Sequence, residues 1–247
     1  DPGAPDTPEI PEGTVVYANN CDKAEATKTY GSGSSYPYLD QFDGWKNETG
    51  SGISAVDYGF KTVSVRSNSP STGQYSRYAG SGVNNLFFGT NAYFIVKNIT
   101  LDEGRNYVLS FGSEKYLTGG DSNFNKDEFK VYVSNDGAKW VALDYQIGSS
   151  EIEGKWNLNT SETFTVGADD KSLSLYFTAS VASAYRLDDI TLTAVEEEGR
   201  TVDFSAGVSL DGGETGGDTP GTDPAETKTI AEMITIADNA AVQSNEV

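Results

Sequence analysis

The chain of 247 residues contains no histidine, and this absence excludes more functions than any other feature of its composition. Without histidine there is no Ser-His-Asp or Cys-His nucleophilic mechanism, no histidine-ligated zinc and no imidazole general base. Cys21 is the only cysteine, so the chain has no internal disulfide. It follows the apolar stretch Val15, Val16 and Tyr17, which indicates a buried small hydrophobic residue rather than a nucleophile.

Basic residues are also scarce, with 17 Lys and Arg against 37 Asp and Glu and a formal net charge of −20. This balance argues against nucleic acid and against an anionic membrane surface, because both are recognised through Lys and Arg. No stretch is long and apolar enough to predict a membrane span. The acidity favours solubility, and it leaves open that some carboxylates bind a cation.

Glycine and aromatic residues, by contrast, are abundant, with 27 Gly and 14 Tyr. Short segments of alternating Val, Ile, Tyr, Phe and Thr are separated by Gly, Asn, Asp and Ser, which is typical of strands and turns. The clearest segments are residues 14–20, 60–68, 86–90, 92–101, 129–133 and 172–179. Roughly eight to ten such strands predict an all-β fold in which two sheets face each other.

Three segments fall outside the predicted sandwich at residues 14–197. Residues 1–13 are a Pro-, Gly- and acid-rich spacer, of the kind that holds a domain away from an anchor. Residues 198–227 are polar and rich in Gly, Pro and Asp, which predicts a linker. Residues 228–247 have apolar side chains at helical spacing, and we expect the incomplete start of a further domain there.

The last predicted strand, AYRLDDITLTAV, contains two adjacent aspartates. Strict alternation places Asp188 on the same face as Ile190 and Leu192, which predicts that this carboxylate points into the core. Burial of a carboxylate is costly unless a positive group compensates it. Arg186, two residues earlier on the same face, is one candidate partner.

Several motifs resemble galactose-binding-like jelly rolls, which are common among carbohydrate-binding modules and Bacteroidetes surface lipoproteins. The motifs are an opening strand ending in Ala18-Asn19-Asn20-Cys21-Asp22, an early Gly44-Trp45, the hairpin from Val131 to Trp140, and the closing strand from Leu187 to Leu192. The resemblance covers about residues 14–195. It implies a jelly-roll β-sandwich of two antiparallel sheets.

The resemblance also implies a structural calcium bound by the first aspartate of the closing strand. Carried over to this chain, the predicted ligands are Asp188, Asp22 and Asn20. Calcium is a hard cation that prefers carboxylate, amide and carbonyl oxygens, so the site needs no histidine. The family often has an acidic residue just before the aromatic of the opening strand, and this chain does not, so the partner of Asp188 stays open.

Two long polar loops carry the candidate ligand-binding residues. Aromatic rings can pack against sugar faces, and arginine can donate hydrogen bonds to sugar hydroxyls. The candidates are Tyr36, Tyr38 and Trp45 in the first loop and Tyr75, Arg77 and Tyr78 in the second. The alternative is that Trp45 caps the end of the sandwich and that the tyrosines only edge its core.

The function that the resemblance implies is a non-catalytic, extracellular carbohydrate-binding module on the cell surface, with a glycan or polysaccharide as its partner. We expect a monomeric outer-membrane lipoprotein that meets the membrane only through an N-terminal lipid anchor. The sequence leaves two alternatives: an adhesion or spacer module without sugar specificity, and an accessory domain of a larger extracellular hydrolase. Catalysis could use only a carboxylate pair, which any acidic chain offers, so we do not expect an enzyme.

Overall fold

The structure is a computed structural model that describes residues 13–29, 35–67, 82–101, 106–115, 124–148, 156–180 and 185–212. The chain divides into two compact units, Asp1–Glu214 and Thr215–Val247, and all the described residues belong to the first. The predicted spacer up to residue 12 and the predicted further domain at 228–247 lie outside the described residues. None of the described helices is long and apolar enough to cross a membrane.

The described residues are almost entirely β-structure, which confirms the predicted fold class. Five of the strands have only two residues, which is why there are more strands than the sequence predicted. The strands are β1 (Thr14–Asn19), β2 (Glu48–Thr49), β3 (Asp57–Ser67), β4 (Asn84–Thr100), β5 (Asn106–Lys115), β6 (Phe129–Ser134), β7 (Val141–Ala142), β8 (Tyr145–Gln146), β9 (Asn157–Ser161), β10 (Phe164–Thr165), β11 (Ser172–Ala179), β12 (Tyr185–Val195) and β13 (Arg200–Thr201). Four short 3-10 helices accompany them at Leu39–Gln41, Asp43–Trp45, Ile53–Ala55 and Phe204–Ala206.

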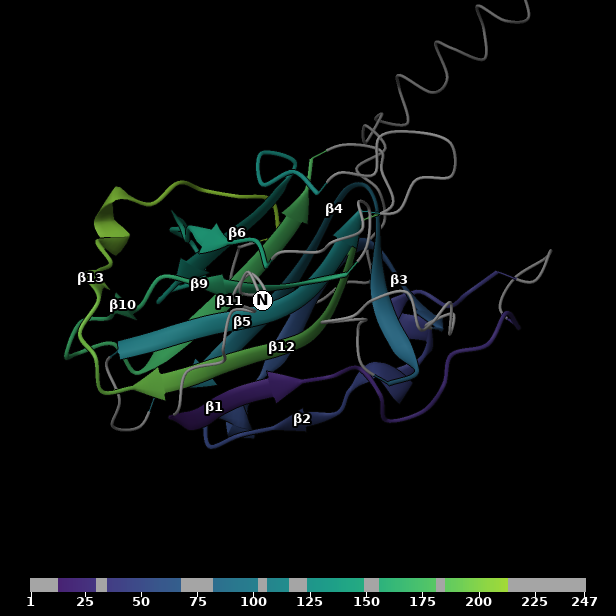
Figure 1. The fold of residues 1–247 in the computed structure, drawn as a ribbon, viewed down its shortest axis with the longest axis horizontal. Coiled ribbons are helices and arrows are strands. Elements are labelled where there is room, and N and C mark those ends of the chain that lie inside the picture. The colour runs from purple at the N-terminus through teal and green to yellow at the C-terminus, as the bar shows by residue number, and fades with distance from the viewer. Residues whose placement is uncertain are drawn as a thin grey trace, which may run out of the picture. The chain divides into compact units, whose positions relative to one another are not determined.

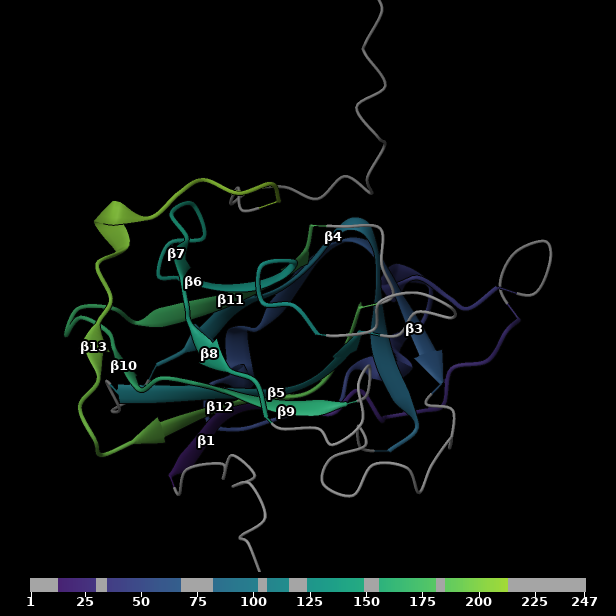
Figure 2. The ribbon, with the colours of Figure 1, turned by 45° about the horizontal axis from the view of Figure 1, so that its top comes forward.

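The strands form one hydrogen-bonded sheet that folds over into the two layers of a jelly-roll β-sandwich (Figure 1). The first half of β4 pairs with β12 in one layer, and its second half pairs with β11 in the other. Strand β3 pairs with β4 along both halves. Figure 2 shows β11 and β6 in the upper layer and β5, β12 and β1 in the lower one. Some neighbouring strands are distant in sequence, as in jelly rolls, for example β5 beside β12 and β4 beside β11, and among the described strands all pairs except β10 with β13 are antiparallel.

The sheet passes from one layer to the other through a bend in the β3–β4 hairpin. Thr62 and Asn91 have positive φ angles of 56° and 50°, and the register of the two strands shifts beside Thr62. A Cβ atom on Gly89 would lie 2.6 Å from Cγ2 of Thr62, so a side chain does not fit there. The sequence predicted two separate strands here, because local composition does not show that one strand can run through both layers.

Aromatic rings from both layers form the core. The ring centroid of Phe111 on β5 lies 5.4 Å from that of Phe177 on β11 and 6.2 Å from that of Phe129 on β6. Phe129 in turn lies 5.4 Å from Tyr185 on β12. All four side chains are completely buried, and contacts of this kind hold the two sheets of a sandwich together.

The closing strand β12 departs from the predicted alternation at its two aspartates. Its register with β5 shifts by one residue between Asp188 and Thr191, and Asp189 has a φ angle of +47°. This β-bulge reverses the alternation, so the prediction that Asp188 shares the inward face of Ile190 and Leu192 is wrong. Asp188 is nevertheless 0% exposed, so its burial was predicted correctly.

The domain extends beyond the predicted end at residue 197, because residues 200–212 pack on the sandwich. Strand β13 pairs with β10, and the backbones of Trp140 and Val208 exchange hydrogen bonds of 2.8 and 2.9 Å. Val202 is buried, and Leu210 packs against Trp140 and its aromatic neighbours. Because these scattered apolar residues pack against the sandwich, residues 200–212 belong to the folded domain. The predicted linker at 198–227 therefore begins too early.

Candidate functional site

Trp45, one of the predicted ligand-binding aromatics, belongs to the core. It is 1% exposed, and its ring makes edge contacts with Tyr58 at 4.7 Å and Phe94 at 5.7 Å. Its indole N–H donates a hydrogen bond of 3.0 Å to the carbonyl of Leu39. A ring that is 1% exposed cannot stack on a sugar, so the prediction of a ligand role for Trp45 is corrected to a packing role.

The two tyrosines of the first loop differ in exposure. Tyr36 is partly buried, its hydroxyl is hydrogen-bonded to Ser67, and the amine of Lys28 lies 5.3 Å from its ring centroid. Tyr38 is 49% exposed and leaves much of its ring accessible. Tyr75, Arg77 and Tyr78 of the second loop lie outside the described residues. Among the predicted aromatics that the structure describes, Tyr38 is therefore the best suited to contact a ligand.

Tyr38 begins a row of side chains that crosses four neighbouring strands. The directly opposed pairs are Tyr38 with Ser64, Ser64 with Phe87, Phe87 with Arg186, and Arg186 with Glu114. Opposed residues project to the same side of a sheet, at spacings of about 5 Å. We call these five residues the cross-strand row.

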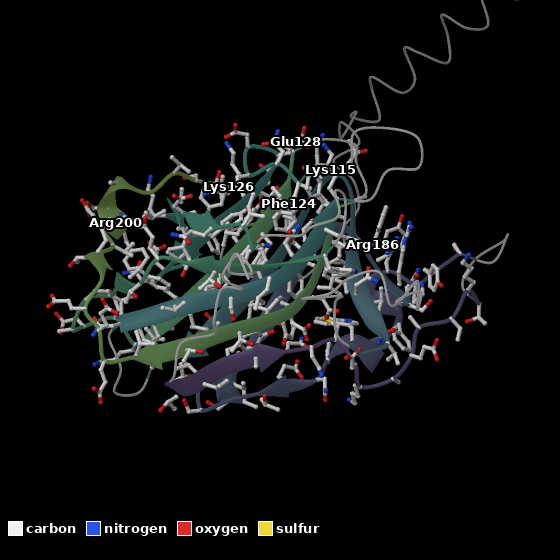
Figure 3. The ribbon with its side chains drawn as sticks, viewed as in Figure 1. Lys115, Phe124, Lys126, Glu128, Arg186 and Arg200 are labelled. Atoms are coloured by element: carbon white, nitrogen blue, oxygen red, sulfur yellow. The ribbon has the colours of Figure 1, made fainter. Side chains whose placement is uncertain are left out.

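The cross-strand row lies on the side of the sheet that faces away from the core. Its members alternate along their strands with Val65, Leu86 and Leu187, all of them fully buried in the core. Figure 3 shows Arg186 near the end of β12 that lies beside β3 and β4. Sequence alone could not reveal this row, because alternation tells which side a residue takes but not which residue lies opposite.

Two arginines lie beside the ring of Phe87. Arg66, two residues along β3 from Ser64, places its guanidinium carbon 3.3 Å from the ring centroid of Phe87. The guanidinium carbon of Arg186 lies 6.0 Å from the same centroid. Arg186 forms an ion pair of 3.0 Å with Glu114, whose side chain is almost fully buried.

Arg66 has no such partner within the described residues. Its Nε atom is buried without a hydrogen bond. Burial lowers the pKa of Arg66, and the positive charge of Arg186 lowers it further. The two guanidinium groups are thus close enough to repel each other, although only Arg186 is paired with Glu114.

The predicted calcium ligands come together at the end of β1. Burial raises the pKa of the Cys21 thiol, and the nearby charges of Asp188, Asp22 and Asp189 raise it further. Cys21 is itself fully buried in the core, as predicted. Strand β1 pairs with β12 beside this turn, with Asn19 opposite Ile190, so the opening and closing strands meet next to Cys21.

The oxygens of Asp22 and Asn20 already accept hydrogen bonds from the protein. Oδ1 of Asp22 accepts from the backbone N–H groups of Val83 at 2.8 Å and Asn84 at 2.9 Å. Oδ1 of Asn20 accepts from the side-chain amide of Asn47 at 2.7 Å and from the N–H of Asp22 at 3.3 Å. The predicted ligands therefore fit a calcium ion only in part. The carboxylates of Asp188 and Asp22 suit a cation, whereas the side-chain oxygen of Asn20 already accepts two hydrogen bonds from the protein.

Within the described ranges, no group of three or more His, Cys, Asp and Glu side chains is arranged to hold a metal ion. A calcium at this turn would therefore depend on Asp188 and Asp22 together with amide or carbonyl oxygens.

Comparisons with known proteins found likeness only among solved structures. No protein-family model and no curated protein matches the chain. The CBM22-1 xylan-binding domain of Paenibacillus barcinonensis Xyn10C is 11% identical with a TM-score of 0.43, over 76% of this chain and 99% of that one. A family 35 carbohydrate-binding module from Clostridium thermocellum is 10% identical with a TM-score of 0.34, over 56% of this chain and 93% of that one.

A third similar structure comprises the CBM22-1 and GH10 modules of the Clostridium thermocellum endo-1,4-β-D-xylanase 10B, in complex with xylohexaose. It is 13% identical with a TM-score of 0.39, over 57% of this chain and 26% of that one. The match thus spans about a quarter of that enzyme chain. Identities and TM-scores this low assign no function to the present chain.

Proposed function

We propose that this domain is a non-catalytic carbohydrate-binding module whose ligand lies on the face that carries the cross-strand row. The observation that carries the proposal is the meeting of one exposed aromatic ring, Tyr38, with the serine and arginine side chains of that row and the neighbouring Arg66. An aromatic plane packs against the apolar face of a pyranose, and guanidinium and hydroxyl groups bond its hydroxyls.

Binding is favoured over hydrolysis by the carboxylates of this face. Glycoside hydrolysis needs two carboxyl groups on opposite sides of the scissile bond. The cross-strand row contains one, Glu114, which is 2% exposed and paired with Arg186. Asp188, two residues from Arg186 on the same side of β12, is 0% exposed. A buried, ion-paired carboxylate is poorly placed to donate a proton to a leaving group.

The test is a binding screen of the full chain against neutral and acidic polysaccharides in buffer that contains calcium. We expect at least one glycan to bind, and Tyr38→Ala to weaken that binding about tenfold, since loss of one aromatic contact is worth about 1 kcal/mol or slightly more. Tyr132→Ala is the matched control, because Tyr132 lies in the other layer on β6. If no glycan binds, the adhesion or spacer alternative replaces this proposal.

The structural calcium is a second part of the proposal, supported by the buried Asp188 and the carboxylates gathered around Cys21. A cation bound only by the folded state at 100 times its dissociation constant stabilises it by about 2.7 kcal/mol. We therefore expect millimolar calcium to raise the melting temperature by about 5–10 °C relative to EDTA. Asp188→Asn should abolish this rise, while Asp136→Asn, in an exposed turn, should retain it. An equal melting temperature with calcium and with EDTA would remove calcium from the proposal.

Display at the cell surface is the third part of the proposal. It is supported by the composition of residues 1–13, which suits a spacer between an anchor and a folded domain. Labelling of intact source cells with a membrane-impermeant amine reagent should modify the protein. Labelling only after lysis would contradict surface display.

A further inference from the structure

The pair of arginines beside Phe87 bears on the kind of glycan that this face would select. Guanidinium groups only donate hydrogen bonds, and the carboxylate of the cross-strand row, Glu114, already accepts from Arg186. Among the side chains of the cross-strand row and Arg66, two guanidinium groups therefore stand against one carboxylate. Neutral sugars present hydroxyls that both donate and accept, whereas a carboxylate or sulfate only accepts.

We propose that the ligand is an acidic glycan, and that Arg66, assisted by Arg186, binds an anionic group on its sugar residues. This inference rests on the proposed function, and it adds the chemical class of the ligand. The anionic group is a carboxylate or a sulfate, which share the planar or trigonal array of acceptor oxygens that a guanidinium matches with two parallel hydrogen bonds.

The stacking of Arg66 on Phe87 orients its guanidinium group for binding an anion. With its guanidinium carbon 3.3 Å from the ring centroid, Arg66 covers that face of Phe87, so the ring orients the arginine instead of stacking on a sugar. Stacking restricts the guanidinium without using its N–H groups as donors to the protein. The exposed ring of Tyr38, opposite Ser64 in the cross-strand row, is the surface against which the sugar itself would pack.

Charge supports the same conclusion. Arg66 and Arg186 both lie beside Phe87 in a chain of net charge −20, and Arg186 forms an ion pair with Glu114. An anion that contacts both guanidinium groups would relieve their repulsion. The rest of the chain repels a polyanion over long distances, and salt screens that repulsion beyond about 8 Å at physiological ionic strength. Contacts with a half-buried arginine are screened much less, so binding should survive at about 150 mM salt.

The experiment uses the full chain at this salt concentration and two pairs of polymers. Polygalacturonate is compared with its methyl-esterified form, and carrageenan with agarose, so that each acidic polymer has a neutral counterpart. We expect at least tenfold tighter binding to the acidic member of one pair, and that pair identifies carboxylate or sulfate. Arg66→Ala should remove the preference.

Two further variants keep the test decisive. Arg66→Lys retains the charge and the folded structure but loses the planar donor array, so it should recover only part of the affinity. Arg200→Ala, at the opposite end of the sandwich from Arg186 (Figure 3), should bind like the wild type. Should Arg66→Ala fail to fold, Arg66→Lys and the neutral polymers still decide the question.

The outcomes separate this inference from the proposed function. Equal binding of acidic and neutral polymers, or acidic binding that Tyr38→Ala abolishes and both Arg66 variants leave unchanged, would overturn the inference while the carbohydrate-binding proposal stands. Absence of binding to every polymer would overturn both. Tighter binding of an acidic polymer that depends on Arg66 supports both.

Discussion

Replacement of Trp45 by alanine distinguishes the packing role seen in the structure from the ligand role that the sequence suggested. Trp45 is 1% exposed, makes edge contacts with Tyr58 and Phe94, and donates a hydrogen bond to the Leu39 carbonyl. Truncation of a buried Trp or Phe to Ala costs about 3–5 kcal/mol. The two aromatic contacts and the lost hydrogen bond put Trp45→Ala in the upper half of this range, at about 4–5 kcal/mol.

Urea unfolding measures this change directly. For a domain of this size the free energy of unfolding falls by about 2–3 kcal/mol per molar urea, so the midpoint should fall by about 1.3–2.5 M. Tyr38→Ala is the matched control: because Tyr38 is 49% exposed, its free energy of unfolding should change by no more than about 0.5 kcal/mol.

The binding and unfolding results together decide the role of Trp45. We expect Trp45→Ala to lose stability and Tyr38→Ala to lose glycan affinity. The reasoning would be refuted if Trp45→Ala kept its urea midpoint but lost glycan binding, because a core residue cannot be removed without cost. That result would restore Trp45 to the ligand-binding residues.

Three other predictions follow from particular contacts. The pKa of Asp136 is lowered because backbone N–H groups donate to its carboxylate; its stabilisation is therefore complete above the unfolded pKa of about 3.9 and is lost as the pH falls through the lower folded value. Asp136→Ala should cost about 1 kcal/mol at pH 7 and almost nothing near pH 2, as urea unfolding at the two pH values would show. A chain that ends at Thr201 should expose Trp140 and shift its fluorescence emission to longer wavelengths; unchanged emission would mean that the following segment does not cover this ring. Tyr145→Phe removes the 2.6 Å hydrogen bond to the Phe129 carbonyl and should lower stability by about 1–2 kcal/mol in thermal unfolding, whereas an unchanged melting temperature would contradict a buried bond.

Much of the fold could be predicted from the sequence because strand alternation is a local property. The segments around β1, β3, β6 and β11 were found from their apolar periodicity, and the turn between β6 and β7 from Asn135-Asp136-Gly137. The bulge in β12 could not be found in this way. One extra residue changes which side every later side chain takes, and nothing in the local composition of AYRLDDITLTAV marks it.

The candidate site was predictable only in its individual residues. Tyr38 stood out as an aromatic residue in a polar loop, and its exposure agrees with that interpretation. Trp45 had the same sequence signal and proved to be core, since composition does not show which ring meets other rings. Arg66 gave no signal, because it is an isolated charge within a strand, and Arg186 was noticed only as a candidate partner of Asp188.

By itself, therefore, the sequence determined the β-class, the absence of histidine chemistry, the acidity and the burial of Cys21 and Asp188. Only the tertiary structure decided which residues meet. Arg66 and Arg186 come from strands far apart in the chain, and they lie on either side of Phe87 because β4 pairs with β3 on one edge and with β12 on the other. Alternation assigns a side chain to one side of its own strand, but its neighbours across the sheet depend on strand order and register, which arise from long-range pairing.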